Sequence, residues 1–266
     1  MLTSLAVYLI GGAVTGILAG LLGVGGGIVI VPLLNVLFAW QGFPADQIQH
    51  LSLGTSMAAI IFTSISSFMA HNRRGAVCWS IWRAVTPGIL VGTFGGTWIA
   101  AGLSTGFLRG FFACFLVIVG TQMLLNMKPK PGRELPGGPQ LAGVGGGIGL
   151  LSSFVGIGGG TISVPFMSWC NVPIHVAVGT SAAIGLPIAL AGAAGYILNG
   201  WGVVGLPAGS LGFVYLPALA GLVAASMLTA PLGVRLGHSL PVAKLKRIFG
   251  IFIYIMAARM IWTLLG

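Results

Sequence analysis

The chain has 266 residues, of which 56% are hydrophobic and only 5% are charged. A soluble domain carries about 25% charged residues, so this composition excludes a soluble globular protein and predicts an integral membrane protein. The net charge is +10, but the basic residues lie mainly in short loops between apolar segments, which is typical of orientation in a membrane rather than of nucleic-acid binding.

Apolar segments follow one another along the whole chain and predict an all-α membrane protein. A helix that crosses the hydrocarbon core needs about 20 apolar residues, and six segments meet this length roughly: 48–70, 77–101, 106–127, 175–198, 209–234 and 244–265. Four more flank two glycine stretches: 4–22, 28–40, 140–155 and 161–170. Those that follow the glycines are too short to cross. The first run has no basic leader and no cleavage site of small residues, so we expect it to be retained.

One polar stretch divides the chain into two parts. Residues 128–139 read KPKPGRELPGGP, and the prolines and glycines in them disfavour a helix. We interpret this stretch as a cytoplasmic linker between a first transmembrane repeat, 1–127, and a second one, 140–266.

The two parts share four landmarks in the same order, which indicates an internal duplication. GVGGGIVIVP at 23–32 matches GIGGGTISVP at 156–165, and HLSLGTS at 50–56 matches HVAVGTS at 175–181. Pro87 is paired with Pro217, and LRGFFACF at 108–115 with LKRIFGIF at 245–252.

The basic residues also predict the topology. Arg73, Arg74, the linker and the segment 235–247 hold most of the positive charge, whereas the loops near 41–47, 102–105 and 199–208 hold no Lys or Arg. All the basic loops fall on the cytoplasmic side only if each glycine stretch is a hairpin that returns to its starting side. Each repeat is then a glycine-turn hairpin plus three transmembrane helices, and the two repeats have inverted topology.

Consecutive glycines inside an apolar run need an explanation, because unpaired backbone groups at membrane depth are costly. The turns at Gly25, Gly26 and Gly27 and at Gly158, Gly159 and Gly160 would offer bare N–H groups, and the helix that follows each would point its positive end at them. We therefore predict an anion site there. The alternatives are close helix packing and a dinucleotide loop, which would need a preceding strand and a ribose-binding acid.

Hydroxyl residues follow each turn at a similar place. If their helices start near Pro44 and Pro173, Thr55 lies about 16 Å and Thr180 about 10 Å along them. Thr55 and Ser56, together with Thr180 and Ser181, could donate to an anion. The alternative is that they bond to the carbonyl four residues earlier.

Three further side chains are candidates for anion contact. His50 and His175 occupy matching positions and could bind an anion or carry a proton, although histidines also occur at membrane interfaces. Arg83 lies six residues inside a predicted span, where it could contact substrate or reach the interface.

Several site classes are absent from the sequence. The only acids, Asp46 and Glu134, lie outside the spans, so no carboxylate relay or carboxylate-lined cation path is expected. No catalytic or metal-binding motif is present, and we expect no enzyme, no metal and no cofactor. The three cysteines, Cys78, Cys114 and Cys170, are expected to be buried hydrophobic residues.

The glycine stretches and the two histidine–glycine–threonine–serine segments resemble those of the sulfite exporter TauE/SafE family of membrane anion permeases, and the resemblance covers nearly the whole chain. It implies a multi-pass protein of the bacterial inner membrane in two related halves, with a small sulfur-containing or organic anion as its substrate. It also implies that the glycine and hydroxyl residues named above form the site.

We therefore expect a secondary transporter for an anion such as sulfite, thiosulfate or sulfoacetate, working by alternating access in the lipid bilayer. A proton or a sodium ion could be coupled, and the sequence assigns no oligomeric state. The alternatives are an anion channel or facilitator, and a membrane partner subunit that does not transport.

Overall fold

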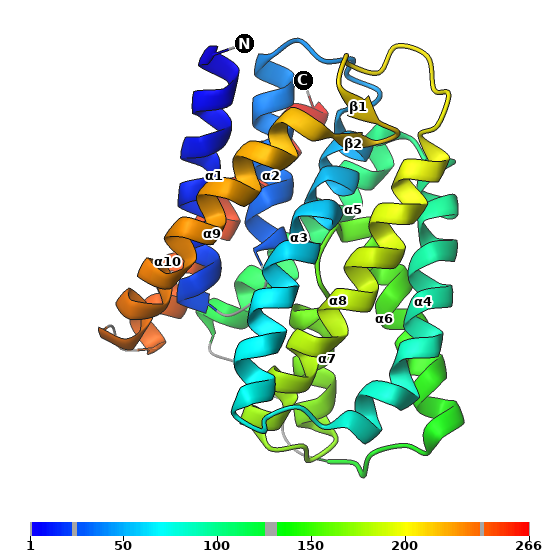
Figure 1. Ribbon diagram of the computed structural model, residues 1–266, viewed down its shortest axis with the longest axis vertical. Helices are drawn as coiled ribbons and strands as arrows, with labels where there is room; N and C mark the ends of the chain where they lie inside the picture. The colour runs from blue at the N-terminus through cyan, green and yellow to red at the C-terminus, as the bar shows by residue number, and fades with distance from the viewer. Residues whose placement is uncertain (1, 23–25, 126–131, 240–241, 266) are drawn as a thin grey trace.

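The computed structural model describes residues 2–22, 26–125, 132–239 and 242–265, which form a bundle of helices (Figure 1). The helices before the linker are α1 (Leu2–Leu22), α2 (Gly27–Trp40), α3 (Ile48–Arg73), α4 (Trp79–Ala101) and α5 (Thr105–Leu124). Those after it are α6 (Gly138–Val155), α7 (Gly160–Trp169), α8 (Ile174–Asn199), α9 (Leu216–Ser239) and α10 (Val242–Leu265). Between α8 and α9 lie two short strands, β1 (Ser210–Leu211) and β2 (Val214–Tyr215). Residues 132–137 of the linker form neither helix nor strand.

Helices α3, α4, α5 and α8 are long and apolar enough to cross a membrane, which confirms four of the six predicted spans. The other two predicted spans are also helices, α9 and α10. In these two, the apolar stretches found among the described side chains are shorter, Leu216–Thr229 and Phe249–Leu264. The chain is therefore an α-helical membrane protein.

The predicted span 209–234 begins too early. Residues 210–215 form an antiparallel hairpin in which Ser210 pairs with Tyr215 and Leu211 with Val214, and α9 starts only at Leu216. Gly209 and Gly212 have φ angles of 91° and 55°, a left-handed conformation that glycine adopts readily and a helix does not contain. Hydropathy alone could not detect this, because the hairpin is as apolar as the helix after it.

Both helices that follow the glycine stretches are short, as predicted. With 14 residues in α2 and 10 in α7, they extend about 21 Å and 15 Å at 1.5 Å per residue, less than the ~30 Å hydrocarbon core. Each is preceded by a left-handed glycine, Gly26 with φ 76° and Gly159 with φ 73°. In Figure 1, α1 starts and α2 ends at the upper end of the bundle, whereas α6 starts and α7 ends at the lower end.

The main helix pairs join the part before the linker to the part after it. Helix α1 packs on α9, α4 on α6, α3 on α8 and α5 on α10. Glycine permits the closest of these approaches: a Cβ added to Gly12 of α1 would lie 2.7 Å from the carbonyl oxygen of Leu222 in α9. One added to Gly88 of α4 would lie 2.7 Å from the carbonyl carbon of Ala142 in α6. The sequence did not predict these partners.

Two of the predicted landmark pairs have different outcomes. Leu108 is the fourth residue of α5 and Leu245 the fourth residue of α10, so the paired segments occupy equivalent places in two helices that pack together. In contrast, Pro87 lies well inside α4, while Pro217 is the second residue of α9. The pairing of these two prolines was wrong, because prolines occur at helix starts and inside membrane helices alike.

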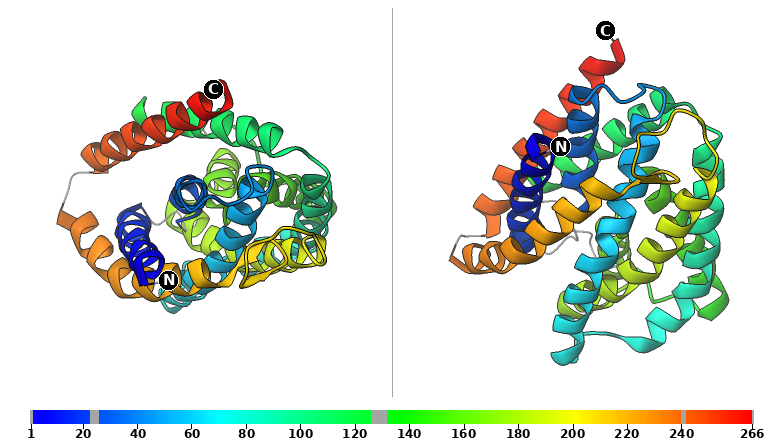
Figure 2. Two further views of the ribbon diagram at one scale, coloured as in Figure 1. Left: turned by 90° about the horizontal axis from the view of Figure 1, so that it is seen from above. Right: turned by 45° about the horizontal axis from the view of Figure 1, so that its top comes forward.

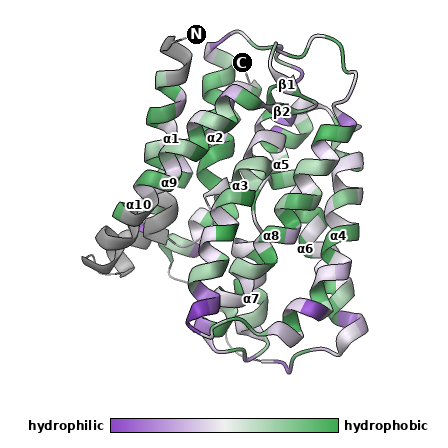
Figure 3. Cartoon of the chain, viewed as in Figure 1, coloured by the Kyte–Doolittle hydropathy of each residue, from purple (hydrophilic) through white to green (hydrophobic). Residues whose placement is uncertain are grey.

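The outer surface is apolar along the helices, with hydrophilic residues gathered at the ends, most densely at the lower end of α3 and the start of α4 (Figure 3). Large apolar side chains such as Val91, Trp98 and Trp262 are more than half exposed. A multi-pass protein places such side chains against lipid, where their exposure to hydrocarbon costs nothing.

Candidate functional site

The start of α2 meets the second glycine turn inside the bundle. Seen from above, α2 and α7 lie inside the outline drawn by α4, α5, α9 and α10 (Figure 2). A Cβ added to Gly27, at the start of α2, would lie 2.7 Å from the carbonyl oxygen of Gly156 and 3.0 Å from the Cα atom of Ile157. The first glycine turn therefore contacts the backbone of the second, and only glycine fits at this contact.

The start of α2 is buried and that of α7 is half-buried, and neither has a side-chain cap among the described residues. Gly26, Gly27 and Ile28 are buried in the first turn, and Gly158 and Gly159 in the second. Among the described residues, no side chain accepts a hydrogen bond from the first N–H groups of α2 or α7. In the described part of the chain, the N–H groups of Gly160 and Thr161 have no acceptor. Gly25 lies outside the described residues.

Two hydroxyl groups beside the second turn are buried without a hydrogen-bond partner among the described residues. Ser152 of α6 is 0% exposed, and its Oγ lies 3.6 Å from the position of a Cβ on Gly159. The Oγ1 of Thr161, in the first turn of α7, is also buried and unpartnered. Buried polar atoms nearly always have a hydrogen-bond partner. These hydroxyls and the N–H groups beside them are therefore suited to binding a ligand that accepts hydrogen bonds. The sequence prediction missed both residues, although each lies within one helical turn of the repeated glycines.

The four predicted hydroxyl residues make contacts between elements and not with the carbonyl four residues earlier. Ser56 donates from Oγ to the carbonyl oxygen of Gly156 at 2.8 Å. The Oγ of Ser181 lies 2.7 Å from that of Ser163, whose hydroxyl also donates to the carbonyl oxygen of Gly159 at 2.9 Å. Ser56 therefore bonds the second glycine turn directly, and Ser181 reaches it through Ser163.

The two threonines hold the starts of other helices. Thr55 of α3 accepts a hydrogen bond from the N–H of Tyr215 at 3.0 Å. Thr180 of α8 accepts one from the N–H of Cys78 at 2.9 Å. Tyr215 and Cys78 directly precede α9 and α4, so each threonine anchors a helix of the other half. Because α3 begins at Ile48 and not near Pro44, Thr55 lies about 10 Å along its helix rather than the predicted 16 Å.

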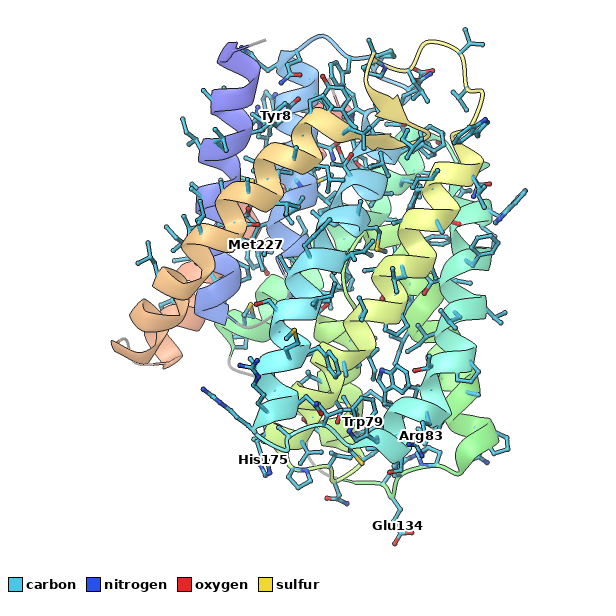
Figure 4. The ribbon with its side chains drawn as sticks, viewed as in Figure 1. Tyr8, Trp79, Arg83, Glu134, His175 and Met227 are labelled. Carbon is cyan, nitrogen blue, oxygen red and sulfur yellow. The ribbon has the colours of Figure 1, made fainter. Side chains whose placement is uncertain are left out.

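The two histidines lie in different surroundings, and the structure does not bring them to the glycine turns. His50 is buried, with Nε2 3.1 Å from the carbonyl oxygen of Ala100 and its ring 5.1 Å from that of Phe213. His175 is exposed at the lower end of the bundle, and so is Arg83 (Figure 4). Across the described residues, no three His, Cys, Asp or Glu side chains lie close enough together to hold a metal ion.

The sequence pattern that defines the sulfite exporter TauE/SafE family matches residues 8–260. The chain belongs to this family. A probable membrane transporter protein of Haemophilus influenzae is 36% identical to this TauE/SafE chain over 261 residues, which are 98% of this chain and 99% of the relative. No solved structure matches it.

More distant relatives carry the same description. The probable membrane transporter protein YunE of Bacillus subtilis is 26% identical and aligns with 74% of this chain and 80% of its own length. The probable membrane transporter protein MJ0441 of Methanocaldococcus jannaschii is 28% identical and aligns with 68% of this chain and 67% of its own length. This TauE/SafE protein is therefore a multi-pass membrane transporter and not an enzyme.

The three cysteines of the TauE/SafE protein differ in exposure, and the expectation that all are buried was wrong. Cys170 is buried, Cys78 is half-buried and Cys114 is exposed. The Sγ of Cys78 lies 3.2 Å from the hydroxyl of Ser80. This hydroxyl and the N–H of Ile81 hydrogen-bond the sulfur and lower the pKa of the Cys78 thiol, whereas burial raises the pKa of Cys170.

Cys78 should consequently react with N-ethylmaleimide several-fold faster than Cys170 at pH 7, because the thiolate is the nucleophile and a lower pKa increases its fraction. Ser80→Ala should slow the reaction at Cys78 and leave that at Cys170 unchanged. Mass spectrometry of peptides after timed labelling measures each rate separately. Equal rates at Cys78 in the two proteins would refute the role assigned to Ser80.

Proposed function

We propose that this protein is a secondary transporter that moves a small sulfur oxyanion or organosulfonate, such as sulfite, thiosulfate or sulfoacetate, across the bacterial inner membrane. One observation carries the proposal: the uncapped starts of α2 and α7 lie at two glycine turns whose backbones touch, beside buried hydroxyls that lack a partner among the described residues. Helix N-termini favour anions, since their N–H groups and dipoles point at the ligand.

The proposed site combines backbone and hydroxyl donors. The N–H groups at Gly158, Gly159 and Gly160 and the hydroxyls of Ser152 and Thr161 would bind the anion from the second turn. Gly26 and Gly27 would face it from the first turn. The chain has only two acids, Asp46 and Glu134, and both are exposed in loops. An anion at the turns therefore meets positive dipoles and no opposing carboxylate.

The remaining predicted side chains have separate roles in this proposal. Ser56 would hold the second turn in shape through its bond to Gly156, and Ser181 would do so through its contact with Ser163. Thr55 and Thr180 would position α9 and α4. The exposed His175 and Arg83 would meet the anion only at the lower end of the path. Coupling to a proton through His50, or to sodium through backbone carbonyls, remains part of the proposal.

We also propose that residues 1–127 and 140–266 are inverted repeats joined by a cytoplasmic linker, 128–139. Three features support this. The two hairpins open toward opposite ends of the bundle (Figure 1). The pairing of α1 with α9 has its counterpart in the pairing of α6 with α4. The bond from Tyr215 to Thr55 has its counterpart in the bond from Cys78 to Thr180. Such symmetry suits alternating access around a central site.

Alternating access is favoured over an open channel by the direct backbone contact of the two turns. An anion can pass between Gly27 and Gly156 only if one turn moves away from the other, because their atoms already touch. Movement of one repeat against the other would open the site to each side in turn. Single-channel currents in a planar bilayer would contradict this mechanism and favour the channel.

Replacing Ser152 with alanine tests the site directly. Removing one hydrogen bond to a charged ligand costs about 1.5–3 kcal/mol, so uptake of [35S]sulfite or [35S]thiosulfate into proteoliposomes should fall about tenfold or more. The thermal unfolding midpoint should stay constant or rise, because the buried Oγ of Ser152 has no partner to lose among the described residues.

Ser153→Ala is the matched control. Its Oγ donates to the carbonyl oxygen of Leu150 in the same helix, so its loss should leave uptake close to that of the wild type. Wild-type uptake in a folded Ser152→Ala protein would refute the proposed site. No uptake of any tested sulfur anion by the wild type would favour a partner subunit that does not transport.

A further inference from the structure

A second concave site lies at the end of the bundle where α2 ends, between α2, α5 and α10. It is a cavity of about 70 Å³. Its lining is mainly apolar, and its polar residues are Asn35 of α2, Arg109 of α5, and Arg259 and Thr263 of α10. The α2 residues that line it begin at Pro32, about 7 Å or more along the helix from Gly27. The cavity is therefore separate from the contact between the glycine turns.

Two arginines line this one small cavity without a carboxylate. The chain has only two acidic side chains, Asp46 and Glu134, and neither lines the cavity. A guanidinium within a membrane-spanning helix is costly and usually has a partner, and two that share a cavity also repel each other. An anion bound beside them would offset both penalties.

The contact between Asn35 and Arg109 orients one of the two guanidinium groups. Asn35 is only 8% exposed, and its Nδ2 donates to the carbonyl oxygen of Val31 at 3.0 Å. Its Oδ1 accepts a hydrogen bond from the Nε of Arg109 at 3.3 Å. Among the described residues, the terminal nitrogens of Arg109 donate to no other group. The amide thus holds Nε and leaves the terminal N–H groups for an oxyanion, which guanidinium groups bind in bidentate fashion.

The apolar residues of the cavity define the rest of the ligand. Met256 and Met260 of α10 line it together with Pro32, Val36 and Ala39 of α2. Methionine side chains adapt to irregular apolar groups. An inorganic anion has nothing to place against this surface, whereas an organic anion has an apolar part that fits it.

We propose that Arg109, Arg259 and Asn35 form a second anion-binding site, which takes an oxyanion head carrying a small apolar group. Two sources have this chemistry: a soluble organosulfonate, or the phosphate and first methylene groups of a phospholipid. The site is independent of the one proposed at the glycine turns, with which it shares no residue.

Trifluoromethanesulfonate is a suitable probe, since it joins an oxyanion to an apolar group and is visible by 19F NMR. Binding is measured with delipidated protein in dodecyl maltoside, in a Ser152→Ala background that weakens the glycine-turn site. Arg259→Gln and Arg109→Gln should each weaken binding about tenfold, from the loss of a charged hydrogen bond. The exposed side chain of Arg259 makes its variant the safer of the two for folding. Arg73→Gln removes the same charge at the opposite end of the bundle and should have no effect.

A second arm distinguishes the two sources. Native mass spectrometry of the same proteins, after addition of dioleoylphosphatidylglycerol, measures lipid retention. If the two arginine variants lose only trifluoromethanesulfonate binding, the natural ligand of the site is a soluble organic anion. If they lose lipid retention, the natural ligand is a phospholipid. The proposal is overturned if the Ser152→Ala background protein, the two arginine variants and Arg73→Gln all bind trifluoromethanesulfonate and the lipid equally well. It is also overturned if the background protein binds neither of these probes. If this second site is refuted, the sulfite flux of the wild type and its loss in Ser152→Ala should still be observed, so the two proposals are tested separately.

Discussion

Valine in place of Gly88 is expected to leave little folded protein, whereas valine in place of Gly95 in the same helix should be tolerated. A Cβ on Gly88 would lie 2.7 Å from the carbonyl carbon of Ala142 and 2.9 Å from the backbone nitrogen of Gly146. Both are backbone atoms of α6, which cannot rotate away as a side chain can. Helices α4 and α6 would have to separate along their contact.

The expected loss is large because overpacking usually costs 1–3 kcal/mol even where side chains can adjust. For Gly88→Val we expect about 3 kcal/mol or more. Apart from its own helix backbone, no described residue has an atom within 4 Å of a Cβ added to Gly95, so its variant should retain the wild-type unfolding midpoint within a few degrees. The check is the yield of monodisperse protein in dodecyl maltoside, with the thermal unfolding midpoint of whatever is recovered. Similar midpoints for both variants would show that α4 and α6 are not in backbone contact.

The two threonines that anchor helices across the halves give the second large effect. Thr55→Val keeps the shape of the side chain and removes the acceptor of the Tyr215 N–H, and Thr180→Val does the same for the Cys78 N–H. Leaving a fully buried donor without an acceptor costs about 1–3 kcal/mol, and these half-buried donors should fall near the lower end of that range. The two bonds share no residue, so the double variant should lose the sum of the two single effects.

Thr63→Val provides the comparison for this pair. Its Oγ1 donates to the carbonyl oxygen of Ile60 in the same helix, so its loss affects no contact between helices and should cost less than about 0.5 kcal/mol. Chemical unfolding in mixed micelles, followed by tryptophan fluorescence, reports all four variants. A double variant no less stable than Thr63→Val would argue against the anchoring role.

Local features of this fold could be predicted from the sequence because local chemistry decides them. Gly26 and Gly159 have a left-handed conformation where the chain reverses inside an apolar region. Glycine adopts this conformation readily, so the glycines in the sequence indicate the turns. The shortness of α2 and α7 follows from the distance between these turns and the polar loops. The positions of the main spans follow from hydropathy, which is the dominant constraint on a chain in lipid.

Helix partners could not be predicted in the same way. The chain has 45 glycines, so nearly every helix has a face that permits close approach. The sequence alone does not distinguish Gly12, which packs against another helix, from Gly95, which does not. The choice of α9 for α1 depends on the whole arrangement. The same holds for Ser152, which resembles any helical serine until the structure shows that its hydroxyl has no carbonyl partner among the described residues.

Repeat symmetry also predicted more equivalence than the structure contains. His50 and His175 match in sequence, but one is buried against Ala100 and Phe213 while the other is exposed. Duplicated segments start from the same residues and then adapt to different neighbours. A side-chain role is thus less transferable between the halves than a backbone turn.

The packing of α1 on α9 has a consequence for biosynthesis. The ribosome delivers α1 first, but about 200 further residues must emerge before the surface that covers it is made. Until then, Gly12 and its neighbours are exposed to lipid or to an insertion factor. A chain truncated after the linker should therefore be held by the insertion machinery or degraded, because neither half encloses its own first helix.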